Sequence, residues 1–80
     1  MQIKVLAFGI AKEIFGSNGI ILDIEGEVTI YHIRETLEAQ YPRLKQLANY
    51  MVAVNNEYAN NEVLVNAMDE IAIIPPVSGG

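Results

Sequence analysis

The feature that most constrains this chain is its C-terminal stretch, in which an apolar strand pattern runs directly into two prolines. Residues 71–74 are apolar and mostly β-branched, which is typical of a strand buried on both faces at the centre of a small sheet. Pro75 and Pro76 then remove two backbone donors and hold φ near the polyproline value. We therefore expect a central last strand that continues into a stiff, extended tail.

The tail itself is small and carries no side chain that could anchor it. Val77 and Ser78 precede Gly79 and Gly80, so the chain finishes on two residues without a Cβ. A carboxylate carried on two glycines can enter a channel that is too narrow for side chains. The sequence contains no cysteine, which excludes a disulfide, a thiolate metal site and a cysteine nucleophile. The carboxylate of Gly80 is therefore the candidate reactive group, on a tail predicted to be flexible.

The ending Pro-Pro-Val-Ser-Gly-Gly, preceded by Asp69-Glu70 and the apolar strand, resembles the C-terminal signature of the molybdopterin synthase small subunit. That family consists of ubiquitin-like sulfur carriers with a β-grasp fold. The segments 3–8 and 53–55 are also similar to the family, so the resemblance covers the whole chain. The chain departs from it at Ala67-Met68, where the family often has an Asp-Gly turn. The geometry of that turn is therefore open.

The resemblance implies that this chain is no enzyme on its own but the sulfur-donating subunit of a two-subunit sulfurtransferase. A ubiquitin-activating-like adenylating enzyme would use ATP to activate the Gly80 carboxylate, and a sulfur donor protein would turn it into a thiocarboxylate. The tail of Pro75, Pro76, Val77, Ser78 and Gly79 would then enter the large synthase subunit, where a pterin precursor is converted in molybdenum cofactor biosynthesis. The chain itself would bind no cofactor.

Two other interpretations share the Gly-Gly ending. A thiamine-pathway sulfur carrier or a ubiquitin-like protein modifier would use the same terminal carboxylate, although the Pro75-Pro76 pair speaks against both. A β-grasp interaction module, from a different class, would have a disordered tail and no covalent chemistry. Reaction with an adenylating enzyme, ATP and a sulfur donor would separate a carrier from such a module.

Length and composition limit the class of protein. A chain of 80 residues supports one domain, residues 1–80, with a modest core between two layers. The formal net charge of −5 argues against nucleic acid and anionic membranes, and it favours partners with basic surfaces. No apolar run is long enough to span a bilayer and no segment resembles a signal peptide, so we expect a cytoplasmic protein.

Hydrophobic periodicity predicts an α+β fold of the β-grasp type, a mixed sheet of about five strands with one main helix packed on one face. Strands are expected over residues 2–8, 20–25, 51–54, 57–59 and 71–74, a short helix within 9–17, a further helical turn within 43–50 and a connector over 63–68. The main helix should begin after the N-cap Thr29 and end before Pro42. Its apolar stripe consists of Ile30, Ile33, Leu37 and Tyr41.

The alternation of side chains along strands places three apolar residues on the sheet face opposite this helix. In the last strand Ile73 should point inward and Ile74 outward, while Phe8 ends the first strand and Tyr58 lies in the fourth. An exposed apolar patch beside a functional tail is typical of a docking site, and the resemblance implies that partners bind there. The alternative is incidental exposure, which is common for single apolar residues.

The remaining candidates favour structural interpretations. His32, the single histidine, falls on the helix surface without a nucleophile or carboxylate arranged around it. Asp23, Glu25 and Glu27 offer carboxylates to a hard cation, but ligands from one straight strand seldom converge, so a solvated edge is favoured and no metal site is expected. The four tyrosines are scattered without the interleaved basic residues of a nucleic-acid platform, and we expect most of them in the core or at its rim.

Overall fold

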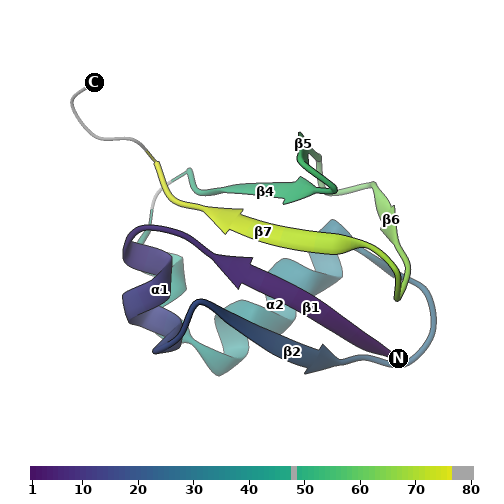
Figure 1. Cartoon of the computed structure of the whole chain (residues 1–80), viewed down its shortest axis with the longest axis horizontal. Helices are drawn as coiled ribbons and strands as arrows, with labels where there is room; N and C mark the ends of the chain where they lie inside the picture. The colour runs from purple at the N-terminus through teal and green to yellow at the C-terminus, as the bar shows by residue number, and fades with distance from the viewer. Residues whose placement is uncertain (48, 77–80) are drawn as a thin grey trace.

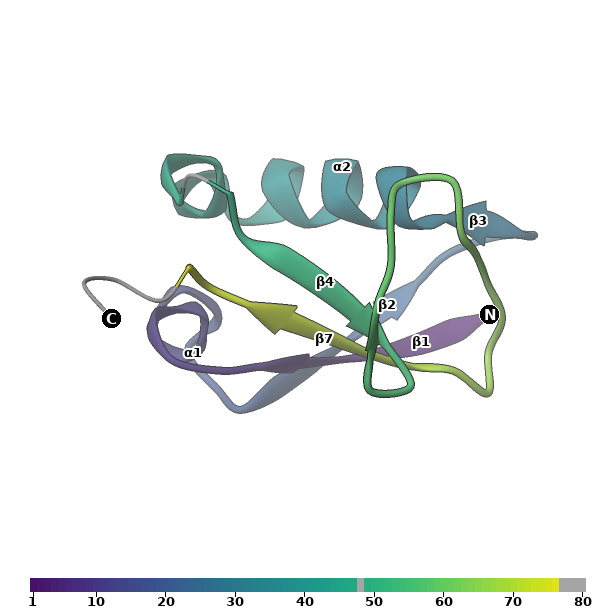
Figure 2. The same cartoon turned by 90° about the horizontal axis from the view of Figure 1, so that it is seen from above.

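The computed structural model describes residues 1–47 and 49–76, which form a five-stranded mixed sheet with the main helix α2 (Ile30–Gln40) across one face (Figure 1 and Figure 2). The sheet has the strand order β2-β1-β7-β4-β5. These strands are β1 (Gln2–Ala7), β2 (Gly19–Asp23), β4 (Met51–Val54), β5 (Glu57–Tyr58) and β7 (Glu70–Ile74). The predicted α+β class, the β-grasp architecture and the single main helix are confirmed.

The last strand, β7, is central as predicted, since it pairs parallel to β1 and antiparallel to β4. The expectation that it is buried on both faces is wrong. Ile71 and Ile73 are 0% exposed, whereas Ala72 and Ile74 are only half-buried. The physical reason is that α2 covers one face of the sheet only, so alternate side chains of the same strand meet different surroundings.

The core lies between the sheet and α2. The helix contributes the predicted stripe, with Tyr41 half-buried and its ring centroid 4.7 Å from that of Phe15. Thr29 is the N-cap as predicted, because its hydroxyl oxygen accepts from the backbone N–H of His32 at 3.3 Å. The fully buried aliphatic side chains at 0% exposure are Ile3, Val5, Ala11, Ile30, Ile33, Leu37, Leu44, Val52, Ile71 and Ile73.

The first two strands are shifted slightly from their predicted bounds. β1 ends at Ala7 rather than at Phe8, because Gly9, with φ +55°, turns the chain into helix α1 (Ile10–Phe15). Gly16, at φ +78°, then ends α1, and its N–H donates to the Lys12 carbonyl at 2.8 Å. β2 covers residues 19–23 rather than 20–25.

The prediction of a plain connector over 63–68 is wrong. Residues of this segment form β6 (Leu64–Val65), which pairs antiparallel with β3 (Val28–Thr29) in a separate two-stranded sheet. The predicted turn of helix within 43–50 is confirmed as the 3-10 helix η1 (Pro42–Gln46), whose Leu44 is buried. Within the described residues, neither α1 nor α2 nor η1 has the length and apolar character needed to cross a bilayer.

Candidate functional site at the base of the C-terminal tail

The tail leaves the sheet beside the turn that follows β1. The backbone N–H of Phe8 donates to the carbonyl of Ile73 at 3.3 Å, which continues the β1–β7 pairing to the last turn of the sheet. Pro75 is half-buried and packs on Gly9, where an added Cβ would lie 3.0 Å from Pro75 Cγ. Pro76 is exposed. The point at which the tail departs is thus held by packing against the body.

The remaining predicted tail residues, Val77, Ser78, Gly79 and Gly80, lie outside the described residues. The predictions that the tail is flexible and that it presents a reactive terminal carboxylate therefore stay predictions. The structure places the origin of this tail: it follows a strand at the centre of the sheet, next to Phe8.

An apolar groove of about 300 Å³ opens on the face of the sheet that α2 leaves uncovered. All three residues predicted to form a docking patch line it: Phe8 is 49% exposed, Tyr58 is 66% exposed and Ile74 is half-buried. The full lining is Leu6, Phe8, Ala53, Asn56, Tyr58, Glu70, Ala72 and Ile74. The predicted facing is confirmed by this arrangement, whereas the role of the patch in binding a partner stays a prediction.

Sequence reasoning missed five of the groove residues, of which Asn56 and Glu70 are polar and three are apolar. Leu6, Ala72 and Ala53 lie in register on β1, β7 and β4, and Tyr58 on β5 pairs with Ala53 at the end of this row. The alanine side chains are short, so the row is hollow between Leu6 and Tyr58. Alternation along β1 was a sufficient signal for Leu6, which shares a face with Phe8. The alanines become groove residues only through the strand pairing.

A turn at residues 66–69 closes the connection into β7 without the glycine that the resemblance suggested. The N–H of Asp69 donates to the carbonyl of Asn66 at 3.1 Å, and the side-chain oxygen of Asn66 accepts from the N–H of Met68 at 3.0 Å. Neither Ala67 nor Met68 has a positive φ. An asparagine side chain that hydrogen-bonds the backbone two residues on is a recognised turn former, which explains why this turn needs no Asp-Gly pair.

The same turn is tied to the tight turn between β4 and β5. The side-chain amide of Asn55 donates to Asp69 Oδ1 at 2.9 Å and accepts from the N–H of Glu70 at 3.0 Å. Asp69 Oδ2 also accepts from the N–H of Asn66 at 2.9 Å. The bond from Asn66, followed by the bond from Asn55, lowers the pKa of Asp69 below its ordinary value. These contacts fix the end of the groove away from the tail.

Comparison with known proteins extends this picture over the whole chain. A model of the ThiS family matches residues 5–80. This chain belongs to the ThiS family. It is 40% identical to the molybdopterin synthase sulfur carrier subunit of Dictyostelium discoideum, over 99% of this chain and 96% of that protein. The corresponding subunit of Caenorhabditis elegans is 39% identical, over 100% of this chain and 99% of that one.

Among solved structures, this ThiS-family chain is similar to SAMP1 from Haloferax volcanii, a small archaeal modifier protein. The TM-score is 0.85 at 27% sequence identity, and the match covers 100% of both chains. The similarity in fold therefore extends over the full length of both chains. The resemblance based on the last residues of the sequence is confirmed at the level of the family and of the fold.

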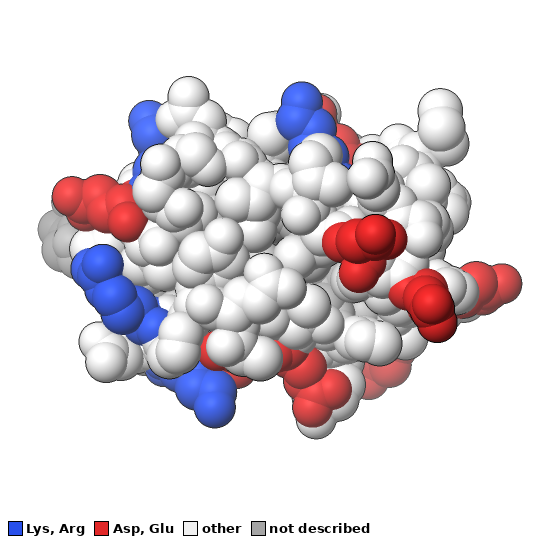
Figure 3. Space-filling model, turned by 90° about the horizontal axis from the view of Figure 1, so that it is seen from below, with Lys and Arg blue, Asp and Glu red and all other residues white. Residues whose placement is uncertain are grey.

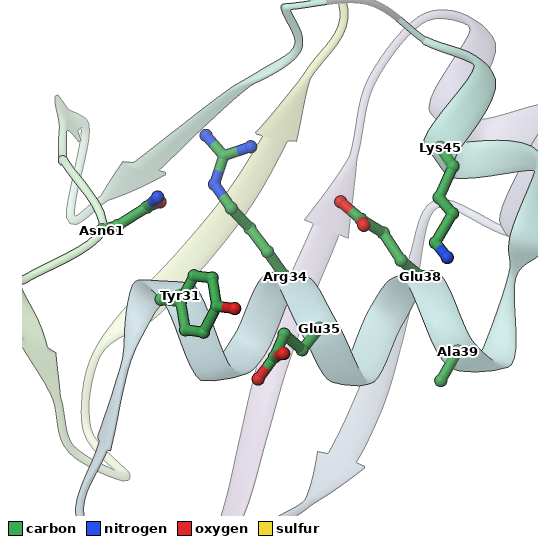
Figure 4. Close-up of a pocket in the computed structure, with 7 residues that line it drawn as sticks. All are labelled: Tyr31, Arg34, Glu35, Glu38, Ala39, Lys45 and Asn61. Carbon is green, nitrogen blue, oxygen red and sulfur yellow. The ribbon is translucent and has the colours of Figure 1, made fainter.

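A second hollow of this ThiS-family protein, about 320 Å³ in volume, lies along α2 (Figure 4). Its lining residues are Tyr31, Arg34, Glu35, Glu38, Ala39, Lys45 and Asn61. Two carboxylates and two cationic groups line it together, so it has no net charge that would select an ion. Arg34 and Glu38 are moreover both engaged with Tyr50.

The contacts of Tyr50 give this region a structural role. Its hydroxyl donates to Glu38 Oε2 at 2.5 Å, and the guanidinium carbon of Arg34 lies 4.5 Å from the centre of its ring. Burial, and then the hydrogen bond to Glu38, strongly raise the pKa of Tyr50. These contacts of Tyr50 with Glu38 and Arg34 hold α2 against the start of β4.

The other candidate residues lie where the sequence suggested. His32 is exposed on α2, Asp23 is exposed at the end of the edge strand β2, and Glu25 and Glu27 are exposed in the segment that follows it. Across residues 1–47 and 49–76, no group of three His, Cys, Asp or Glu side chains is arranged to hold a metal ion. Tyr50 is buried and Tyr41 half-buried, whereas Tyr31 and Tyr58 are exposed, so the expectation that most would lie in the core or at its rim holds for two of the four.

Proposed function

We propose that this chain is the sulfur carrier subunit of a molybdopterin synthase and that the carboxylate of Gly80 carries the sulfur. The observation that carries the proposal is the continuation of the central strand β7 into Pro75-Pro76 and the Gly-Gly ending, beside an open apolar groove. The full-length similarity to proteins named molybdopterin synthase sulfur carrier subunits supports the pathway.

The chemistry requires no side chain of this protein. A terminal carboxyl group, with a pKa of about 3.3 to 3.7, is ionised at neutral pH. Its oxygen attacks the α-phosphorus of ATP on the adenylating enzyme, pyrophosphate leaves, and an acyl-adenylate forms. Sulfur at the oxidation level of sulfide, delivered by a donor protein, then attacks the carbonyl carbon and AMP leaves, so that the chain ends in a thiocarboxylate. Transfer of that sulfur to the pterin precursor, followed by reaction with water, restores the carboxylate.

The groove and the tail would act together in the complex with the large subunit. An apolar projection of the large subunit that fills the groove at Phe8, Tyr58 and Ile74 would place the base of the tail at a fixed position on the partner. From Pro76 the tail can reach at most about 16 to 18 Å, which suits insertion into a pocket of the partner. The formal net charge of −5 would steer basic surfaces of the partners towards the chain.

Intact mass spectrometry tests the proposal. After incubation with the adenylating enzyme, ATP and the sulfur donor, the native chain should show replacement of one oxygen by sulfur. Deletion of Gly80 withdraws the carboxylate, and an alanine appended after Gly80 moves it beyond the reacting position, where a displacement of about 1 Å can cost a hundredfold in rate. Both variants keep the groove and should bind the partners normally. Efficient thiocarboxylate formation on either variant would contradict the proposal.

A second function is favoured by one observation, the similarity to an archaeal modifier protein. A protein modifier or a thiamine-pathway carrier would also be adenylated at Gly80, so the mass change alone does not separate them. Adding the large synthase subunit and the pterin precursor separates these alternatives, because only the thiocarboxylate of a molybdopterin synthase carrier is consumed in their presence. A modifier would instead become attached to lysines of other proteins. A non-covalent interaction module would show no mass change with any of these reagents.

A further inference from the structure

The apolar groove on the open face of the sheet contains one charged side chain, that of Glu70. The other residues that line it are apolar or uncharged: Leu6, Phe8, Ala53, Asn56, Tyr58, Ala72 and Ile74. Glu70 is the first residue of β7, whereas Ile74 is the last residue of this strand and lies next to the tail. The groove therefore has an apolar end beside the tail and an acidic end away from it.

The backbone of Glu70 is fixed by Asn55, which belongs to the tight turn between β4 and β5. The N–H of Glu70 donates to Asn55 Oδ1 at 3.0 Å, and its carbonyl accepts from the N–H of Asn55 at 2.9 Å. Both bonds use only the backbone of Glu70. The carboxylate is therefore carried on a held main chain at the acidic end of the groove, and a change of this side chain leaves both bonds in place.

The carboxylate of Glu70 has no ion-pair partner in the part of the chain that the structure describes. The ion pair found there joins the N-terminal ammonium of Met1 to Asp23, at 3.8 Å. Lys4 is in register with Glu70 on the neighbouring strand β1, but it lines a different hollow of about 270 Å³. Leu6 lines both the groove and this hollow. Glu70 thus supplies the charge of the groove, and Lys4 supplies that of the hollow beside it.

Covering the groove changes the surroundings of this carboxylate. Glu70 is exposed in the chain alone, so water solvates its charge. A partner that fills the groove displaces this water, and burying a carboxylate without a partner is strongly unfavourable. A purely apolar projection would therefore be opposed at the acidic end. A guanidinium or ammonium group at that end would replace the displaced water with a charge-assisted hydrogen bond.

We propose that the large synthase subunit places the cationic side chain of an arginine or lysine on Glu70, while its apolar projection fills the end of the groove at Phe8 and Ile74. This inference rests on the proposed function and names the chemistry that the partner must carry. An ion pair at one end and an apolar contact at the other fix the direction of β7 on the partner, and hence the direction of the tail. A protein that offers only an apolar surface would be rejected at Glu70.

The distribution of charge around the groove favours a basic partner at the same end. Figure 3 shows the side of the molecule that β2 borders in Figure 1, where acidic side chains lie mostly towards the end away from the tail. Asp23, Glu25 and Glu27 are exposed at the end of β2 and in the segment that follows it. Such exposed charges attract a basic surface at long range and are screened by salt, whereas a covered pair at Glu70 is screened much less.

Calorimetric binding of the large subunit to charge variants of the full chain tests the proposal. Glu70→Gln keeps the size of the side chain and removes its charge, and it should weaken binding about tenfold or more. Glu70→Lys places like charges together and should weaken binding further. The matched control is Glu57→Gln, which removes the same charge from β5 outside the groove and should change the affinity by less than about twofold. Lys4→Gln is the second control and should not weaken binding, because Lys4 is not the cation that pairs with Glu70.

Salt and a double-mutant cycle give independent readouts. The ratio of affinities between the wild type and Glu70→Gln should persist at about 0.5 M salt, because a covered ion pair is screened much less than exposed charges are. Neutralising the arginine or lysine of the large subunit that meets Glu70 should weaken binding of the wild type and have little further effect on Glu70→Gln. Melting curves of the variants should stay close to that of the wild type, since the bonds to Asn55 remain.

Binding of Glu70→Gln within about twofold of the wild type overturns the inference. A loss in Glu57→Gln or in Lys4→Gln equal to that in Glu70→Gln overturns it as well. In each of these cases the thiocarboxylate would still form on Gly80 and be consumed with the large subunit, so the proposed function would stand. A native chain that does not bind the large subunit, or that forms no thiocarboxylate, would contradict the proposed function itself and the inference with it.

Discussion

The two faces of the five-stranded sheet use the same kinds of side chain for opposite purposes. Ile73 is 0% exposed beneath α2, and Ile74, one residue later, lies half-buried in the open groove. On the covered face each buried aliphatic side chain contributes about 1.5 to 3 kcal/mol to folding. On the open face, the apolar area that remains exposed contributes nothing to folding and can be buried only by a partner. Folding stability therefore resides in the covered face, and we propose that recognition of a partner resides in the open face.

The largest effect is expected on the covered face. Ile73→Asp would place a carboxylate where no partner is available among buried aliphatic side chains, and we expect it to cost more than about 4 kcal/mol of folding free energy. Circular dichroism during thermal unfolding should show an unfolded or barely folded domain at room temperature. A melting curve close to that of the wild type would contradict the assignment of folding stability to the covered face.

The same substitution one residue later should leave the fold intact and damage binding. In Ile74→Asp the carboxylate remains accessible to water, so the unfolding free energy should change by less than about 1 kcal/mol. Binding to the large synthase subunit, measured by calorimetry, should weaken about tenfold or more, because the charge is desolvated when the groove is covered. Ile74→Leu, which keeps the groove apolar, is the matched control and should bind almost as the wild type does.

A polar contact on the covered side should matter less than the apolar core but remain measurable. Tyr50→Phe removes the bond to Glu38 and should lower the unfolding free energy by about 1 to 2 kcal/mol in urea at neutral pH. Because the pKa of Tyr50 is raised in the folded state, its contribution is fully present below the unfolded value of 10.0 and is lost as the pH rises further. The variant should therefore lose less stability than the wild type in alkali. Equal losses of stability in alkali for the wild type and Tyr50→Phe would contradict the attribution of this pH dependence to Tyr50.

The smallest effect is expected from the exposed contacts of the turn into β7. Asp69→Asn weakens the bonds from Asn66 and Asn55 and should cost less than about 1 kcal/mol, because they lie in solvent. The folded-state pKa of Asp69 is lowered, so this contribution is present above the ordinary value of 3.8 and disappears as the pH falls through the lower folded value. Melting temperatures of the two proteins should differ at neutral pH and converge in acid. A larger loss of unfolding free energy in Asp69→Asn than in Tyr50→Phe would contradict the distinction between buried and exposed polar contacts.

Sequence reasoning succeeded where a residue's role is set by its own segment. The stripe of α2 and the N-cap Thr29 follow from helical spacing and capping chemistry, and the opposite facing of Ile73 and Ile74 follows from the period of a strand. It failed for β3 and β6, because two residues are too few to show a period. Sequence reasoning also wrongly predicted that β7 is buried on both faces, because an apolar run does not reveal how many faces of a strand are covered.

The candidate site divides in the same way. The sequence by itself determined the last strand, the prolines that end it, the glycine ending and the absence of cysteine, because each is a local or compositional property. Only the tertiary structure decided that Leu6, Ala53 and Ala72 form a groove with Phe8, Tyr58 and Ile74, and that β2 lies at an edge of the sheet. The physical reason is that grooves and edges arise from the pairing of strands distant along the chain, and such pairing is a property of the whole sheet.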